Sequence, residues 1–127
     1  RRQFLKLMGA SLALAGLVPV SIFPRWNFLL LAANQLVNHL DKLPALSGGG
    51  YRPRVILRTA IGSERPLHPQ LQHVGDFTEA FRLLCPAIEI VRLEEPGQIV
   101  PAYRRALRRR DGRSTLLVEI GDHYHEK

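Results

Sequence analysis

The chain has 127 residues, which is enough for one domain with its own hydrophobic core. Hydrophobic residues make up 46% and charged residues 23% of the sequence, and these ordinary globular proportions argue against a disordered chain. The formal net charge is +7, from 15 arginines and three lysines against 11 acidic residues; it attracts anions in general but identifies no particular partner.

The opening stretch RRQFLKLMGASLALAGLVPV, residues 1–20, has two competing interpretations. A pair of arginines before a weakly apolar run is typical of a twin-arginine export signal. The part GASLALAGLVPV is also typical of a buried helix that leads into a core strand. Export would need a small-x-small cleavage site just before the next helix, and the small residues at 13–15 come too early for one. We therefore favour the domain interpretation, with residues 1–7 as a foreign or signal-like start.

A strand and a long helix are expected next. VPVSIF, residues 18–23, predicts a short buried strand that Pro24 ends. In RWNFLLLAANQLVNHLDK, residues 25–42, apolar side chains recur every three or four positions, and further apolar residues widen the stripe. This pattern predicts a helix that is covered on most sides. Residues 43–53, LPALSGGGYRP, have the prolines and glycines of a loop.

A second strand and a long loop follow. RVILRTAIG, residues 54–62, is a compact apolar run that predicts a strand ending at Gly62. GSERPLHPQLQHVG, residues 62–75, has two prolines, two histidines and no regular period. Long ordered loops inside a compact domain are uncommon and usually functional, so we look for a site here.

The rest of the chain alternates helices and strands. Asp76 and Glu79 have the spacing of a capping box, which predicts a helix that Pro86 ends. The remaining elements are a strand over residues 87–93, an amphipathic helix whose first turn contains Pro101, and a strand over residues 114–120. Helices between successive strands predict one α/β domain with a mostly parallel sheet and helices on both faces.

Two features have plain structural explanations. Arginines gather where the last helix ends, so that cations on a solvated face offset the negative end of the helix dipole; they are Arg104, Arg105, Arg108, Arg109 and Arg110. Cys85 is the only cysteine, which excludes an internal disulfide and a cysteine-based zinc site. Its place at the end of an apolar helix predicts a position in the core.

Two pairs of histidines are candidates for chemistry. His123 and His125 alternate along the tail, but two imidazoles without a third fixed ligand make a poor site, so we expect no metal. His68 and His73 lie in the long loop before a helix, where ligands of open α/β sheets gather. A histidine there either transfers protons and binds an anionic substrate or is simply a solvent-exposed loop residue. The sequence contains no dinucleotide-binding glycine motif, P-loop or nucleophile elbow.

The order of landmarks along the chain resembles the pyrimidine-binding domain of transketolase-like thiamine diphosphate enzymes. The resemblance runs from about residue 8 to about residue 120 and is carried by GASLALAGLVPVSIFPRWNFLLLAANQLVNHLDKL, SGGGYRPRVILRTAIG, HVGDFTEAF, AIEIVRLEEPGQIVPAYRRAL and STLLVEI. It is closest to the beta subunit of the decarboxylating component of 2-oxo-acid dehydrogenases. It implies a subunit of an oxidoreductase or transferase that uses thiamine diphosphate with Mg²⁺.

The resemblance also implies roles for particular residues. The family's aromatic segment beside the aminopyrimidine ring of the cofactor corresponds to Phe23, Trp26 and Phe28. Its strand with arginine, threonine and glycine corresponds to Arg58, Thr59 and Gly62. The substrate-contacting, catalytic histidine corresponds by spacing to His73. His68 is its rival, because Val74-Gly75 after His73 differ from the family's usual neighbours.

The resemblance further implies that this chain does not act alone. The family's essential glutamate, which hydrogen-bonds the aminopyrimidine, lies upstream of the small-residue helix, and we expect residues 1–127 to form one truncated domain. A partner subunit or domain would hold the diphosphate and Mg²⁺. We therefore expect a cytoplasmic chain, inactive by itself, in a dimer or heterotetramer.

Two alternatives stay open. One is a non-catalytic interaction module or degenerate remnant, which the missing glutamate favours. The other is a protein exported through the twin-arginine pathway. Nucleic acid is not an expected partner, because the arginines are not interleaved with aromatic residues that stack on bases. A membrane is not expected either, because glycines, serines and Pro19 dilute the opening apolar run.

Overall fold

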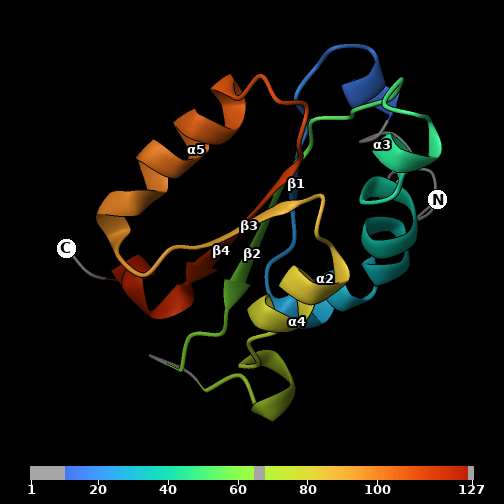
Figure 1. The fold of residues 1–127 in the computed structure, drawn as a ribbon. Helices are drawn as coiled ribbons and strands as arrows, with labels where there is room; N and C mark the ends of the chain where they lie inside the picture. The colour runs from blue at the N-terminus through green and yellow to red at the C-terminus, as the bar shows by residue number, and fades with distance from the viewer. Residues whose placement is uncertain (1–10, 65–67, 126–127) are drawn as a thin grey trace.

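The computed structural model describes residues 11–64 and 68–125. Within them, four strands form one sheet in which every neighbouring pair runs parallel. The strands are β1 (Val20–Ile22), β2 (Ile56–Ile61), β3 (Glu89–Arg92) and β4 (Thr115–Ile120), and their order across the sheet is β1, β2, β4, β3 (Figure 1). The structure thus confirms the predicted α/β fold and its parallel sheet.

Helical segments connect the strands. Between β1 and β2 lie α2 (Trp26–Leu30), a π-helical segment (Gln35–Leu40) and α3 (Leu43–Leu46). Between β2 and β3 lie a 3₁₀ turn (Leu71–His73) and α4 (Thr78–Leu84). A 3₁₀ turn (Pro96–Gln98) and α5 (Ile99–Arg108) join β3 to β4, and a final turn (Gly121–His125) follows β4.

The sheet separates two hydrophobic clusters. The larger one joins β2 and β4 to α2 and α4, through Leu57, Leu116, Leu29 and Phe81. The smaller one joins the other face of the same strands to α5, through Ile56, Leu117 and Ala106. Figure 1 accordingly shows α5 on one side of the sheet and α2 and α4 on the other. Because alternate residues of a strand point to opposite faces, β2 and β4 are apolar on both.

The first strand differs from its prediction as a buried strand. β1 is an edge strand that pairs only with β2 among the described strands. Its two large side chains, Val20 and Ile22, are 47% and 66% exposed. The prediction is wrong because α5 covers β2 and β4 rather than the edge of the sheet.

The long helix predicted over residues 25–42 is divided into α2 and the π-helical segment, and it is not covered on most sides. Its buried apolar residues form one stripe, made of Trp26, Leu29, Ala32 and Leu36. Phe28 and Leu31 are 41% and 69% exposed. The extra apolar residues therefore lie on the surface, because the core contacts only the stripe.

The opening stretch packs against the domain through only part of its apolar side chains. Residues 11–14 are helical, and Ala13 belongs to the larger hydrophobic cluster. Leu12, Leu14 and Leu17 are exposed. The two arginines at the start, with the rest of residues 1–10, lie outside the described residues. In the part of the chain that is described, no helix is both long enough and apolar enough to cross a membrane.

The fourth helix begins with a simpler cap than predicted. Asp76 Oδ1 accepts a hydrogen bond from the Thr78 backbone N–H at 3.0 Å. Glu79 does not complete a capping box but pairs with Arg82 on the same helix. Cys85, directly after α4, is buried as predicted, and burial raises the pKa of its thiol to about 11. The thiol is therefore protonated and unreactive at neutral pH.

Candidate functional site

The loop after β2 crosses the carboxyl end of that strand at very short range. A Cβ atom on Gly62 would lie 2.3 Å from the carbonyl oxygen of His73 and 2.8 Å from Val74 Cα. Only glycine permits this approach, so Gly62 fixes the 3₁₀ turn Leu71–His73 over the end of β2. In parallel α/β sheets this edge, outside the carboxyl ends of the strands, is where ligands bind.

The same loop is held against α2 by an aromatic stack. The rings of Phe28 and His73 are 6.0 Å apart between centroids and inclined by 20°. Arg25, just before α2, donates a hydrogen bond from Nη1 to the carbonyl oxygen of His73 at 3.4 Å. Phe28 keeps a substantial exposed area, and His73 is half-buried. The result is an aromatic surface at the carboxyl ends of β1 and β2.

Buried polar atoms gather around this surface. Within the described residues, four buried side-chain atoms have no hydrogen-bond partner: Trp26 Nε1, Asn27 Oδ1, Thr59 Oγ1 and His73 Nδ1. They belong to α2, β2 and the loop above them. Native proteins rarely leave such groups unpaired, so these atoms are candidates for hydrogen bonds to water or to a bound molecule.

The structure separates the three aromatic residues of the predicted site. Phe28 is on the surface, whereas Trp26 is 1% exposed. The Trp26 ring lies 6.1 Å from the Phe77 ring, edge to face, and 5.1 Å from the Phe81 ring. Phe23 is partly buried against the same cluster. Trp26 and Phe23 therefore support the surface from below, and Phe28 stacks on one of the predicted histidines.

The two candidate histidines have different surroundings. His73 joins Phe28, and its Nε2 lies 3.2 Å from Gln72 Nε2. His68 is exposed, and its Nδ1 accepts a hydrogen bond from the Gln70 backbone N–H at 3.1 Å, which forms a local turn. Gln70 adopts a φ of 77°, unusual for a residue with a side chain. The geometry brings together Phe28 and His73, and it leaves His68 apart from them.

A charged network lies on the opposite face of the sheet, beneath α5. Arg58 of β2 donates from Nε and Nη2 to Glu119 Oε2 of β4 at 2.9 and 2.6 Å. Tyr103 of α5 donates to Glu119 Oε1 at 3.0 Å, and Tyr124 donates to Glu119 Oε2 at 2.5 Å. The Arg58 guanidinium also lies 5.3 Å from the centroid of the Tyr124 ring. This network, Arg58 with Tyr103, Glu119 and Tyr124, joins two strands, α5 and the final turn.

The protonation of the network is fixed near neutral pH. For Glu119, burial opposes ionisation, but hydrogen bonds from Arg58 and Tyr124 outweigh burial and lower the pKa. Burial, with the added effect of the Glu119 carboxylate, raises the pKa of Tyr103 to about 12. Burial and the hydrogen bond to Glu119 likewise raise the pKa of Tyr124. Without a group that titrates near pH 7, the network acts as a structural clamp rather than as an acid–base pair.

Sequence reasoning identified Arg58 but missed its partners. The available signal was a single charged residue in each of two apolar strands. In the observed register, Arg58 stands beside Leu117 and Ala60 stands beside Glu119, so both charges occupy the same face two residues apart. Register between strands is not visible in the sequence, and it is what makes the pair.

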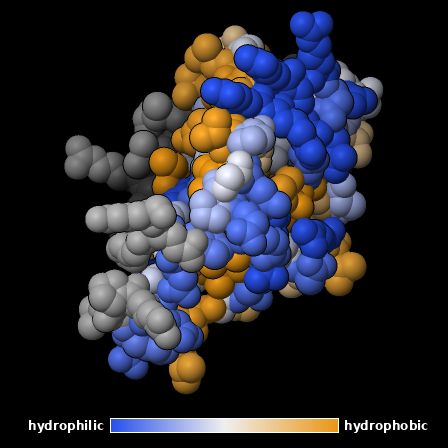
Figure 2. Space-filling view, turned by 90° about the vertical axis from the view of Figure 1, so that its left-hand side faces the viewer, coloured by the Kyte–Doolittle hydropathy of each residue, from blue (hydrophilic) through white to orange (hydrophobic). Residues whose placement is uncertain are grey.

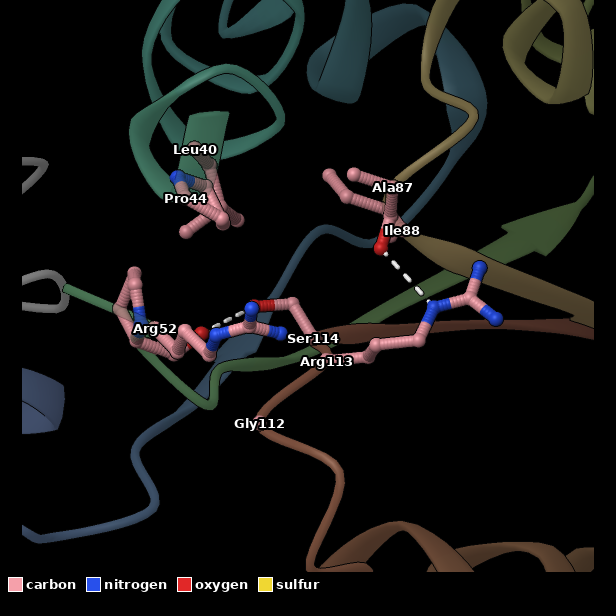
Figure 3. A pocket seen from close by; sticks show the side chains of 9 residues that line it. Leu40, Pro44, Arg52, Ala87, Ile88, Gly112, Arg113 and Ser114 are labelled. Atoms are coloured by element: carbon pink, nitrogen blue, oxygen red, sulfur yellow. Dashed lines mark hydrogen bonds between the residues drawn. The ribbon is translucent and has the colours of Figure 1, made fainter. Parts of the chain in front are cut away.

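A half-open hollow lies at the other, amino-terminal end of the strands (Figure 3). This cavity of about 220 Å³ is lined mainly by apolar side chains, including Leu40, Pro44 and Ile88. Two of its polar side chains bond to backbone carbonyls: Arg113 Nε donates to the Ala87 carbonyl at 3.1 Å, and Ser114 Oγ donates to the Pro53 carbonyl at 2.8 Å. It offers packing rather than chemistry.

Among the described residues, no three histidine, cysteine, aspartate or glutamate side chains come together as a metal site. His123 is placed with its Nε2 2.8 Å from the Glu94 carbonyl oxygen. Comparison of the sequence with protein-family models gave no match, and comparison with curated proteins found no significantly similar sequence.

Proposed function

We propose that the chain contributes the aminopyrimidine-side and substrate-facing surface of a thiamine diphosphate-dependent enzyme of the 2-oxo-acid dehydrogenase or transketolase type. The observation that carries the proposal is the stack of Phe28 on His73 at the carboxyl ends of two parallel strands. These two residues are 45 positions apart in the sequence, and the resemblance assigned one to the cofactor ring and the other to the substrate.

The chemistry of the surface fits a flat, polar heteroaromatic ring. The exposed face of Phe28 offers a stacking partner, which stabilises an aromatic ligand by about 1 kcal/mol beyond area burial. The unpaired buried atoms of Asn27, Thr59 and His73 are an acceptor, a hydroxyl and a ring nitrogen. An aminopyrimidine carries both donors and acceptors that such groups recognise.

In this proposal the chain orients the cofactor and the substrate, and the cofactor carries out the chemistry. Thiamine diphosphate, when bound, supplies the carbanion-stabilising thiazolium chemistry. Phe28 holds the plane of the ring, and His73 hydrogen-bonds the substrate beside it. Gly62 and Arg25 fix the backbone of His73, which places the residue beside Phe28. The diphosphate and Mg²⁺ belong to a partner subunit, in a dimer or heterotetramer.

The proposal is tested by an NMR titration of the purified chain with thiamine diphosphate and Mg²⁺, and separately with thiamine and with pyrophosphate. We expect thiamine and thiamine diphosphate to shift the aromatic resonances of Phe28 and His73 in a saturable way. Phe28→Ala should weaken this binding about fivefold, the equivalent of one aromatic stacking contact.

His68→Ala is the matched control, because it removes an imidazole from the same loop without touching the stack. It should leave the affinity unchanged. Shifts that are absent, or that persist equally in the Phe28 and His73 variants, would contradict the proposal and favour the non-catalytic interaction module instead.

A further inference from the structure

A second cavity, of about 500 Å³, is lined by arginines from two separate parts of the chain. Arg52 and Arg54 come from the segment before β2, and Arg108 and Arg110 come from the end of α5. The rest of its wall is apolar or small, with Leu17 and Gly112 among the lining residues. In Figure 2, a hydrophilic area lies at the upper right of the face, beside a hydrophobic area, at the level at which α5 ends in Figure 1.

The cavity has a strong surplus of positive charge. None of its lining residues is acidic. Arg109, between two of them in the sequence, is neutralised instead by Glu89 and Asp111, each at 2.6 Å. Within the described residues, no ion pair neutralises the guanidinium groups of Arg52, Arg108 and Arg110. The negative end of the α5 dipole amounts to only about half a charge, so it cannot balance four guanidinium groups.

The backbone around two of these arginines shapes their positions: a carbonyl oxygen binds Arg54, and two glycines leave room for the side chain of Arg52. Gly112 has a φ of +74°, and a Cβ atom there would lie 2.9 Å from Arg52 Cβ. A Cβ atom on Gly49 would approach Arg52 Nη2 to 3.2 Å. Arg52 therefore lies between two glycines that leave room for its side chain. Arg54 donates from Nη1 to the carbonyl oxygen of Arg109. The hollow differs from a single helix face because its arginines come from two separate segments of the chain, although Arg52, Arg108 and Arg110 are exposed.

We propose that this cavity binds a small, soluble compound through a phosphate or diphosphate group. The planar guanidinium group donates two parallel hydrogen bonds to phosphate oxygens, which makes arginine the preferred side chain for this recognition. The hollow of about 500 Å³ is open to solvent and large enough to admit a small phosphorylated molecule. The hollow presents arginines from two sides, which suits a compact anion better than a lipid surface or a duplex.

The experiment is calorimetric titration of the purified chain with pyrophosphate at constant ionic strength. The test variant is Arg52→Gln with Arg110→Gln. The matched control is Arg82→Gln with Arg104→Gln, which also removes two positive charges, but outside the cavity. We expect the test variant to bind pyrophosphate about tenfold more weakly, because it loses charge-assisted contacts, and the control to bind within about twofold of the parent chain.

Circular dichroism establishes that each variant is folded, and Arg110→Gln alone, at an exposed position, repeats the test if the double variant is not. Equal weakening by both double variants would show diffuse attraction and overturn the proposal. So would the absence of pyrophosphate binding, or binding only to vesicles that contain phosphatidic acid or to duplex DNA.

This proposal is independent of the one above. Phe28→Ala and His73→Ala should leave pyrophosphate binding unchanged, since neither residue lines the arginine cavity. Conversely, Arg52→Gln with Arg110→Gln should leave the thiamine-induced shifts of Phe28 and His73 intact.

Discussion

At the scale of single residues, the candidate site depends on Gly62, which has no side chain. Gly62 was predicted as the end of a strand, and the structure gives it a second role beneath the backbone of His73. For Trp26, the resemblance implied a place beside the cofactor, and the structure places its side chain in the core. Two positions apart in a helix, Trp26 and Phe28 face nearly opposite sides, but periodicity does not tell which of the two sides the sheet covers.

The packing at Gly62 predicts a specific defect. Gly62→Ala should lower the free energy of unfolding by about 2 kcal/mol or more, because the new methyl group would overlap the His73 carbonyl. Chemical denaturation measures the change. Gly97→Ala is the control, since a Cβ atom there has no neighbour within 4 Å. Similar stabilities for the two variants would show that the loop does not rest on Gly62.

At the scale of elements, the sequence identifies the strands well and their environment poorly. β2, β3 and β4 fall within the predicted segments because compact apolar runs are bounded there by glycine, proline or charge. β1 falls within its segment too, yet it lies at an edge. Whether an apolar strand is central depends on where α5 packs, and that is decided by contacts between distant segments.

Two isoleucines on the same face of neighbouring strands allow the central and the edge strand to be compared. Ile56 of β2 is 1% exposed, whereas Ile22 of β1 is mostly exposed. Ile56→Ala should cost about 3 kcal/mol of folding free energy, because it leaves a cavity under α5. Ile22→Ala should cost less than about 0.5 kcal/mol. Comparable losses, measured by denaturation, would mean that another surface covers β1 in solution.

At the scale of the whole molecule, the Glu119 network joins parts that the sequence presents as separate. It links β2, β4, α5 and the final turn through one carboxylate. The sequence predicted the layers of the fold and the loop that contains His73, because both follow from local patterns. It did not predict the network or the stack of Phe28 on His73, because each requires residues more than 15 positions apart to meet.

The network makes the free energy of unfolding depend on pH. Because the pKa of Glu119 is lowered in the folded state, its stabilisation is fully present above the ordinary glutamate value of about 4.5 and is lost as the pH falls through the lowered value. Glu119→Gln should therefore cost about 2–4 kcal/mol at pH 7, and this difference should shrink steadily below pH 4.5. Denaturation curves from pH 7 to pH 3 measure it.

A glutamate outside the network provides the comparison. Glu79→Gln removes an exposed carboxylate that pairs with Arg82, and it should change stability by less than about 0.5 kcal/mol at each pH. A Glu119→Gln difference that stays constant with pH would contradict the clamp.

The position of Trp26 gives the chain an internal optical reporter. It is the only tryptophan in the sequence, and its indole packs against the rings of Phe77, just before α4, and Phe81, within α4. The fluorescence of Trp26 therefore reports on the packing of α2 against α4. When that junction opens and water reaches the ring, the emission moves to longer wavelength, so the layer beneath Phe28 and His73 can be followed without any attached dye.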